Sequence, residues 1–154
     1  MTRTLNKDQI HEIQKNRHPY LMIDYITDYI PGKSASGYKK LSDDEWFFKV
    51  HWPEDPNMPG MLQIEALVQM ASISILTLPE NNGKLMYLTS ANQLRFVKKI
   101  VPGDQLDIET NVNSFKRGIA NFNGYGYVDN KLACSANFNL ILPEEIKKYS
   151  LKKI

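Results

Sequence analysis

The sequence predicts an α+β fold in which a curved antiparallel sheet wraps around one long central helix. The first observation is an apolar segment, residues 61–78, which Pro59 and Gly60 precede and Pro79 follows. Proline is favoured in the first turn of a helix and stops a helix at its end, so the segment predicts a helix that is apolar nearly all round. Such a helix is normally buried, and a curved sheet would cover it. The second observation is that four runs with strand character follow it: residues 85–97, 105–116, 119–128 and 131–142.

Shorter elements are expected before the central helix. Residues 6–15 predict a short amphipathic helix, because they begin with the spacing of a capping box and contain two isoleucines three positions apart. Residues 21–30 are rich in β-branched and aromatic side chains and predict a strand, which a Pro-Gly turn ends. Residues 36–41 are expected to return antiparallel to it. Residues 46–50 predict a short aromatic strand, which a proline-rich loop separates from the central helix.

The four runs after the central helix are expected to form an antiparallel meander. A Pro-Gly-Asp turn at residues 102–104 separates the first run from the second, and Asp129-Asn130 predicts a tight hairpin between the last two. Residues 143–149 predict a short terminal helix, and a loose basic tail follows them.

Length and composition indicate one globular domain spanning residues 1–154. Hydrophobic residues make up 42% of the chain, and 19 basic against 17 acidic residues leave a net charge of +2, so neither a disordered chain nor a nucleic-acid partner is expected. Glu65 lies inside the apolar segment, where a spanning helix rarely tolerates a carboxylate, so we expect no membrane span. Cys134 has no second cysteine to pair with, and residues 1–16 lack a signal-peptide core, so a reducing, cytoplasmic location is expected.

A polar stripe interrupts the apolar helix. Glu65, Gln69 and Ser72 follow one another at intervals of four and three residues, so they share one helix face. Burying an unpaired charge is costly, and Glu65 must therefore be protonated, paired or placed beside a cavity. The alternative is that the stripe faces solvent or the rim of a subunit contact.

Two further residues are candidates for chemistry. His51 lies directly before the proline-rich loop, fourteen positions ahead of Glu65, and is either a functional histidine or a packing residue. Gly60 opens the helix, where its free N–H and the helix dipole favour developing negative charge. The alternative is that Gly60 only lets the chain turn into the helix.

Other chemistries find little support in the residue pattern. Three scattered histidines and one cysteine lack the spacing of zinc ligands, and no glycine-rich phosphate loop is present, so neither a metal nor another cofactor is expected. Basic residues flank turns between the predicted strands and either form a solvated face or attract an acidic partner. They are Lys98, Lys99, Lys116 and Arg117.

One long motif joins the candidate residues. The segment from His51 to Gln69, HWPEDPNMPGMLQIEALVQ, resembles the signature of the 3-hydroxyacyl-[acyl-carrier-protein] dehydratases of the FabZ type. The resemblance extends upstream to RHPYLMID at residues 17–24 and downstream to residues 92–105, so it covers most of the chain. It implies the hot-dog fold, in which a sheet wraps a long central helix.

The resemblance implies a site that two subunits share. His51 of one subunit and Glu65 of its dimer partner would form the catalytic pair, and the Gly60 N–H would polarise a thioester carbonyl. Glutamate at position 65 is typical of the FabZ branch, whereas the related FabA dehydratase-isomerases carry aspartate there. The implied partners are an acyl carrier protein with a phosphopantetheine-linked acyl chain and a second copy of the chain, in a family that often forms trimers of dimers. The carrier would dock on Arg95, Lys98 and Lys99.

Dehydration of a 3-hydroxyacyl thioester needs three groups. His51 can act as the base, while Gly60 stabilises the oxyanion. Glu65, if apolar neighbours desolvate it, has a raised pKa and can protonate the leaving hydroxyl. Gln69, one turn later, either orients Glu65 and a water molecule or only satisfies backbone groups.

Two departures from the family pattern lie in the proline-rich loop. Glu54-Asp55 stands where the family has glycine after the first proline, and Trp52 replaces the more usual phenylalanine. A pathway-specific paralogue is therefore one interpretation. Two other functions stay open: a hot-dog thioesterase, which need not use His51, and a catalytically silent protein that binds an acyl carrier.

Overall fold

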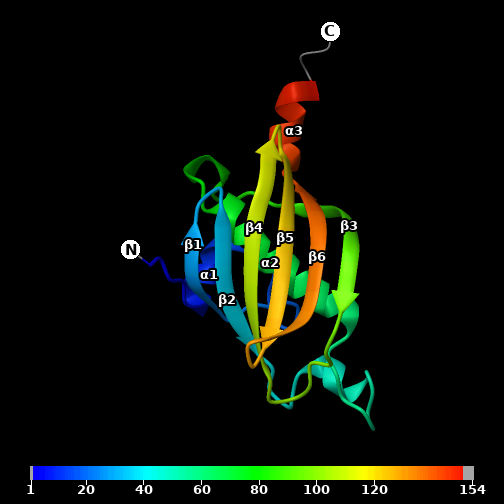
Figure 1. The fold of residues 1–154 in the computed structure, drawn as a ribbon. Coiled ribbons are helices and arrows are strands. Elements are labelled where there is room, and N and C mark those ends of the chain that lie inside the picture. The colour runs from blue at the N-terminus through cyan, green and yellow to red at the C-terminus, as the bar shows by residue number, and fades with distance from the viewer. Residues whose placement is uncertain (1, 151–154) are drawn as a thin grey trace.

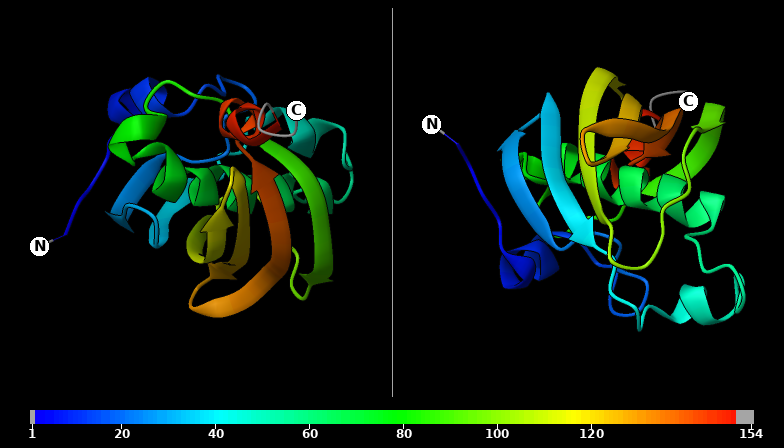
Figure 2. Two further views of the ribbon diagram at one scale, coloured as in Figure 1. Left: turned by 90° about the horizontal axis from the view of Figure 1, so that it is seen from above. Right: turned by 60° about the horizontal axis from the view of Figure 1, so that its bottom comes forward.

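The predicted fold class is confirmed by a computed structural model, which describes residues 2–150. A six-stranded antiparallel sheet curves around helix α2, Gly60–Leu76, and the strand order is β1-β2-β4-β5-β6-β3 (Figure 1). Seen from above, the sheet bends over one side of α2 (Figure 2). The strands are β1 Tyr25–Ile30, β2 Ser34–Lys40, β3 Tyr87–Phe96, β4 Gln105–Lys116, β5 Ile119–Val128 and β6 Lys131–Ile141. The other helical elements are α1 Lys7–Ile13, η1 Trp46–Lys49, η2 Pro79–Asn81 and α3 Pro143–Ser150.

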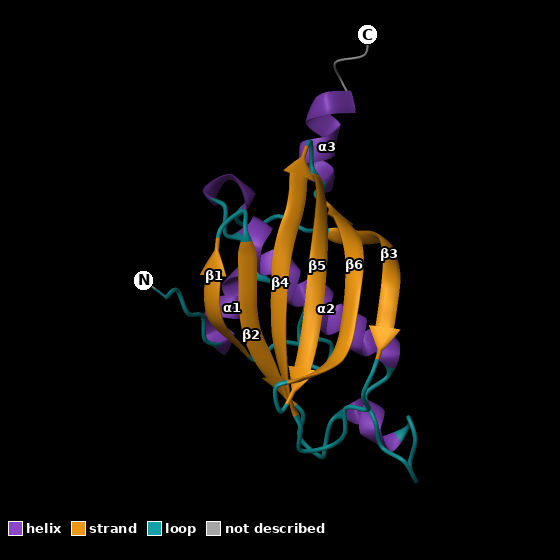
Figure 3. Cartoon of the chain, in the orientation of Figure 1, coloured by secondary structure: helices purple, strands orange, loops and turns teal. Residues whose placement is uncertain are grey.

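The strand order differs in one respect from the predicted meander of four runs. Strands β4, β5 and β6 are consecutive neighbours, as predicted. Strand β3 does not pair with β4; it crosses to the far edge and pairs with β6, with Ala91 opposite Phe138 (Figure 3). The β1–β2 hairpin then joins the sheet through β2 and β4. One consequence is that β3 is an edge strand of the sheet, and its last residue, Phe96, lies against Gly60 at the start of α2.

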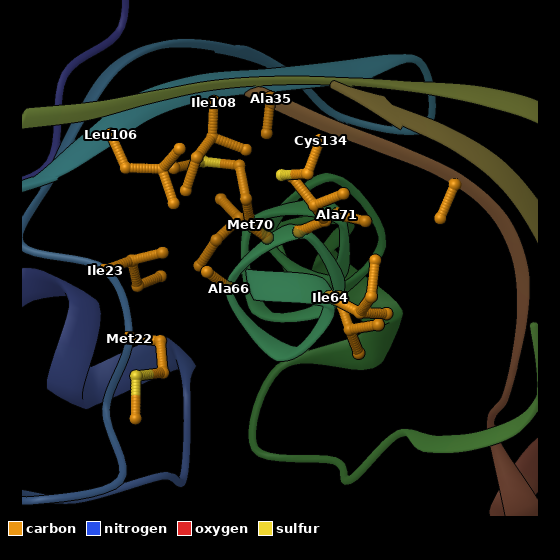
Figure 4. Close-up of a cluster of buried hydrophobic side chains, with 14 of the residues drawn as sticks. Met22, Ile23, Ala35, Ile64, Ala66, Met70, Ala71, Leu106, Ile108 and Cys134 are labelled. Carbon is orange, nitrogen blue, oxygen red and sulfur yellow. The ribbon is translucent and has the colours of Figure 1, made fainter. Parts of the chain in front are cut away.

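Helix α2 is the centre of the core. All of residues 66–76 are buried, as the apolar segment predicts. A methyl group at Gly124 of β5 would lie 3.1 Å from the Cβ atom of Leu67, so this glycine lets the helix approach the sheet closely. Figure 4 shows the close-packed side chains between the helix, the sheet and the segment before β1. They include Ala66, Met70 and Ala71 of α2, Leu106, Ile108 and Cys134 of the sheet, and Met22 and Ile23.

The predicted strand at residues 46–50 is wrong. These residues form the 3₁₀ helix η1, because Phe47 and Phe48 are both buried and their ring centroids lie 4.8 Å apart. Successive side chains of a strand point to opposite faces, whereas a helical turn can bury both. A buried ion pair, with Lys39 Nζ 3.0 Å from Glu45 Oε1, ties β2 to the residue that precedes η1.

The ends of the other elements differ modestly from the prediction. The capping box of α1 is present between Asn6 and Gln9, but the helix ends at Ile13. The first strand begins at Tyr25 and not at residue 21, because the preceding residues lie along α2. Helix α3 follows β6 as predicted, and the expected basic tail at residues 151–154 lies outside the described residues. Within residues 2–150, no helix has the length and apolarity needed to cross a membrane.

Candidate active site

The polar stripe on α2 faces the protein interior and a cavity. Gln69 is buried, and its Nε2 donates to Glu65 Oε1 and to the Tyr20 carbonyl, both at 2.9 Å. The Met22 N–H donates to Gln69 Oε1 at 2.7 Å, which fixes the orientation of the amide. Ser72, also buried, accepts a 2.9 Å hydrogen bond from Gln14. The alternative that the stripe faces solvent is therefore excluded for Gln69 and Ser72.

Glu65 has the environment of a general acid. The carboxyl group is partly buried, and this burial raises its pKa above the ordinary value, while the hydrogen bond from Gln69 opposes the shift. The charge of Glu65 also contributes to a raised pKa of the Tyr20 phenol, after the larger effect of burial. Gln69 thus binds the Glu65 carboxyl group as well as two backbone groups, and its role in orienting Glu65 for catalysis stays a prediction.

A cavity of about 310 Å³ opens beside Glu65. It runs along α2 past Val68 and Ser72 to Leu76, and residues 84–88 cover its other side. A rise of about 1.5 Å per helical residue makes this wall roughly 16 Å long. The Glu65 carboxyl group therefore lies beside an elongated cavity.

His51 directly follows η1 and Val50. Its Nδ1 lies 3.2 Å from the carbonyl oxygen of Asn57, and the Asn57 N–H donates to the His51 carbonyl at 3.1 Å. A carbonyl oxygen can only accept, so this contact places the ring proton of neutral His51 on Nδ1. Nε2 then carries the lone pair that a base needs. The ring stacks on Trp52, with centroids 4.3 Å apart.

The loop between His51 and α2 is ordered despite its unusual Glu54-Asp55 pair. Trp52 and Asp55 exchange backbone hydrogen bonds of 3.2 and 3.1 Å, which close a turn with Glu54 at its tip. Asp55 also forms an exposed 2.5 Å ion pair with Lys99. The departure from the family pattern is thus accommodated in a turn that projects away from the core.

Gly60 is the first residue of α2, and a second cavity of about 390 Å³ adjoins it. Its N–H has no hydrogen-bond acceptor among residues 2–150, in keeping with the free donors of a helix N-terminus. The ring of Phe96 covers the glycine so closely that a Cβ atom would lie 2.9 Å from Phe96 Cε1. This cavity is also lined by Asn57, Met58, Gln63, Val97, Lys98 and Lys99.

The predicted site residues form two separate groups within one chain. His51, its partner Asn57 and Gly60 lie around the start of α2, whereas Glu65 and Gln69 line the other cavity and Gln69 binds the Tyr20 carbonyl. Over residues 2–150, neither of these cavities is lined by both His51 and Glu65. No group of three or more metal-ligating side chains gathers in the same part of the chain.

Three residues of the site were missed by sequence reasoning. Asn57 positions His51, Tyr20 lies near Glu65, and Phe96 covers Gly60. All three lie in the segments that carry the family resemblance, which is the signal that could have found them. The predicted docking residue Arg95 is exposed next to Phe96, and Lys98 and Lys99 line the cavity beside Gly60.

Comparisons with known proteins find one family over most of the chain. A model of the FabA-like domain matches residues 15–137. The 3-hydroxyacyl-[acyl-carrier-protein] dehydratase FabZ of Bacillus velezensis is 39% identical over 140 residues, which are 91% of this chain and 99% of the relative. The FabZ dehydratase of Clostridium botulinum strain Okra is 39% identical over 143 residues, covering 92% and 99% of the two chains.

A solved structure shares the fold at lower identity. The dehydratase heterocomplex ApeI:P from Xenorhabdus doucetiae superposes with a TM-score of 0.77 and 15% identity, over 94% of this chain and 97% of the other. At that identity the likeness concerns the fold alone, and it agrees with the curved sheet around α2.

Proposed function

This chain belongs to the FabA-like family and, within it, to the FabZ-type 3-hydroxyacyl-[acyl-carrier-protein] dehydratases of fatty acid biosynthesis, and we propose that His51, Gly60 and Glu65 carry out its reaction. The observation that carries this proposal is the buried hydrogen-bond network that holds the Glu65 carboxyl group beside an elongated cavity with its pKa raised. A carboxyl group with a raised pKa keeps its proton to higher pH than an ordinary one, which suits it to act as a general acid.

The proposed reaction is an elimination of water. Nε2 of His51 removes the proton from the carbon next to the thioester carbonyl, and the Gly60 N–H stabilises the negative charge that develops on the carbonyl oxygen. Protonated Glu65 gives its proton to the departing hydroxyl group. The carbon–oxygen bond breaks, water leaves and a double bond forms between the second and third carbons. The proton on His51 and the charge on Glu65 are restored through solvent.

The separation of His51 from Glu65 within one chain favours a site shared by two copies. Strand β3 pairs only with β6 among the described strands, so its other edge offers unpaired backbone groups. The strand also exposes large apolar side chains, including Tyr87, Leu88 and Phe96. We propose that a second copy pairs along this edge and brings its Glu65 to the first copy's His51. Assembly of dimers into a trimer stays a prediction.

The substrate arrives on an acyl carrier protein, as the names of the FabZ relatives state for those proteins. We propose that Arg95 and Lys98 attract the acidic carrier, since Lys98 lines the cavity that adjoins Gly60 and Arg95 precedes Phe96, which lines the same cavity. Lys99 contributes less, because its charge is paired with Asp55. Cytoplasmic location stays a prediction.

Turnover of variants tests the assignment. Purified protein is incubated with 3-hydroxyacyl-carrier-protein substrates of graded chain length, and enoyl products are identified by the mass of lost water. His51→Ala and Glu65→Gln are each expected to reduce dehydration roughly 10²–10⁴-fold, whereas His18→Ala, a matched change at an exposed histidine, leaves it unchanged.

Three outcomes would contradict the proposal. Near wild-type dehydration by either site variant would reject these residues. Release of free thiol without enoyl product would indicate a thioesterase, and carrier binding without turnover at any chain length would indicate a silent paralogue.

A further inference from the structure

Gln63 presents a buried polar atom that the chain does not satisfy. Its side chain is only 5% exposed, and its Nε2 donates to the Met58 carbonyl at 2.9 Å. Its Oε1 has no hydrogen-bond partner among residues 2–150. The carbonyl partner fixes the orientation of the amide, because exchanging the two atoms would set oxygen against oxygen. Buried acceptors without a partner are unfavourable and rare, so this one calls for a ligand.

The residue that carries this oxygen lines the cavity that adjoins the start of α2. Gln63 lines this cavity together with Gly60, Phe96 and Lys98. Met58 precedes Gly60 in the chain, so the hydrogen bond to its carbonyl turns the Gln63 side chain back toward the helix N-terminus. Gln63 therefore lies within one helical turn of Gly60, whose N–H is a free donor. A ligand that fits this cavity has a carbonyl oxygen for Gly60 and, a few bonds away, an N–H group for Gln63.

The thiol arm of an acyl carrier has this arrangement. In a pantetheine thioester, two methylene groups separate the sulfur atom from the first amide nitrogen. With the thioester carbonyl at Gly60, the amide N–H lies within reach of a side chain one helical turn further on. Lys98 forms no ion pair within residues 2–150 and lines the same cavity, which suits the anionic end of the arm.

We propose that Gln63 Oε1 accepts a hydrogen bond from the first amide N–H of the pantetheine arm and so fixes the thioester against Gly60. This inference rests on the proposed function. It adds to it a binding residue that acts on the carrier side of the sulfur atom, away from the acyl chain.

A pair of small substrates isolates this contact. One is the 3-hydroxybutyryl thioester of N-acetylcysteamine, which contains the amide; the other is the thioester of 2-mercaptoethyl acetate, in which an ester oxygen replaces the N–H group. The wild-type protein is expected to prefer the amide by about five- to tenfold in kcat/KM, the size of one net hydrogen bond. In Gln63→Leu, kcat/KM for the amide substrate falls by that factor, while the value for the ester is unchanged.

Two further variants keep the test decisive. Gln63→Lys retains a donor for the Met58 carbonyl but lacks the acceptor, so it is expected to lose the preference even if Gln63→Leu folds poorly. Ser74→Ala removes a buried hydroxyl that bonds only Ala71 on the same helix, and it should keep the preference. An equal fall for both substrates, or an unchanged preference in both Gln63 variants, would overturn the inference. Failure of the wild-type protein to dehydrate even an acyl-carrier substrate would instead reject the proposed function.

Discussion

Replacement of Gln69 by leucine separates the structural and the chemical parts of the site. Gln69 holds three polar groups together: it donates to Glu65 and to the Tyr20 carbonyl, and it accepts from the Met22 N–H. Leucine is similar in volume but can make none of these hydrogen bonds. The variant therefore leaves a buried backbone N–H without a partner and frees the carboxyl group of Glu65.

The loss of stability follows from the orphaned backbone groups. Met22 is fully buried, and a buried donor left unsatisfied costs about 1–3 kcal/mol. For a chain of this length, each kcal/mol changes Tm by about 2–4 °C. We expect Gln69→Leu to melt roughly 2–12 °C below wild type, measured by calorimetry at one fixed protein concentration.

The chemical effect appears in the pH dependence of kcat. The hydrogen bond from Gln69 lowers the pKa of Glu65, against the larger effect of burial. Its removal raises that pKa further. Because Glu65 must be protonated to act as the acid, activity falls as pH rises through its pKa, and the alkaline limb of the profile should move to higher pH. Ser74→Ala is the control, since it perturbs α2 without touching Glu65, and its alkaline limb should match wild type. An alkaline limb that stays in place or moves to lower pH in Gln69→Leu would refute the role of Glu65 as the acid.

Other changes have sharper, single readouts. Gly60→Ala should reduce turnover at least tenfold, because the new methyl group fills the approach to the helix N-terminus. Its Tm should change little, because the half-exposed Phe96 ring, 2.9 Å from the new methyl group, can rotate away. A large loss of Tm would show that the glycine serves packing instead. Lys98→Glu should weaken carrier binding and flatten its salt dependence more than Lys99→Glu does, because Lys99 is already paired with Asp55. Binding titrations at several salt concentrations measure both effects, and equal effects would point to another docking surface. Burial raises the pKa of Cys134 to about 12, so its thiol should resist alkylation near neutral pH until the protein is unfolded. Rapid labelling of the native protein would contradict the buried position of this thiol beside β5.

The central helix was predictable because its signals are local. Pro59 and Pro79 bracket an apolar segment, and the polar exceptions on it share one face. Burial of Gln69 depends in addition on the segment before β1, because this side chain binds the Tyr20 carbonyl and the Met22 N–H. The sequence motif also identified His51, Gly60 and Glu65 as the candidate site residues.

Features that depend on distant pairing were beyond sequence reasoning. The crossover of β3 to β6 joins residues about fifty positions apart, and no turn signal encodes such a partner. The aromatic run at η1 has strand propensity, but the burial of both Phe47 and Phe48 overrides it. The contact of His51 with the Asn57 carbonyl involves a backbone atom, which any residue at position 57 could supply.

Activity of mixed dimers tests most directly whether two copies share the site. His51→Ala and Glu65→Gln chains, each inactive alone, are unfolded, mixed in equal amounts and refolded together, with each variant refolded alone as the control. A mixed dimer contains one intact pair, formed by His51 of one chain and Glu65 of the other. Random association makes half of the dimers mixed, so we expect about a quarter of the wild-type turnover to return. Mixed dimers that form and still show no dehydration would contradict a catalytic pair shared between subunits.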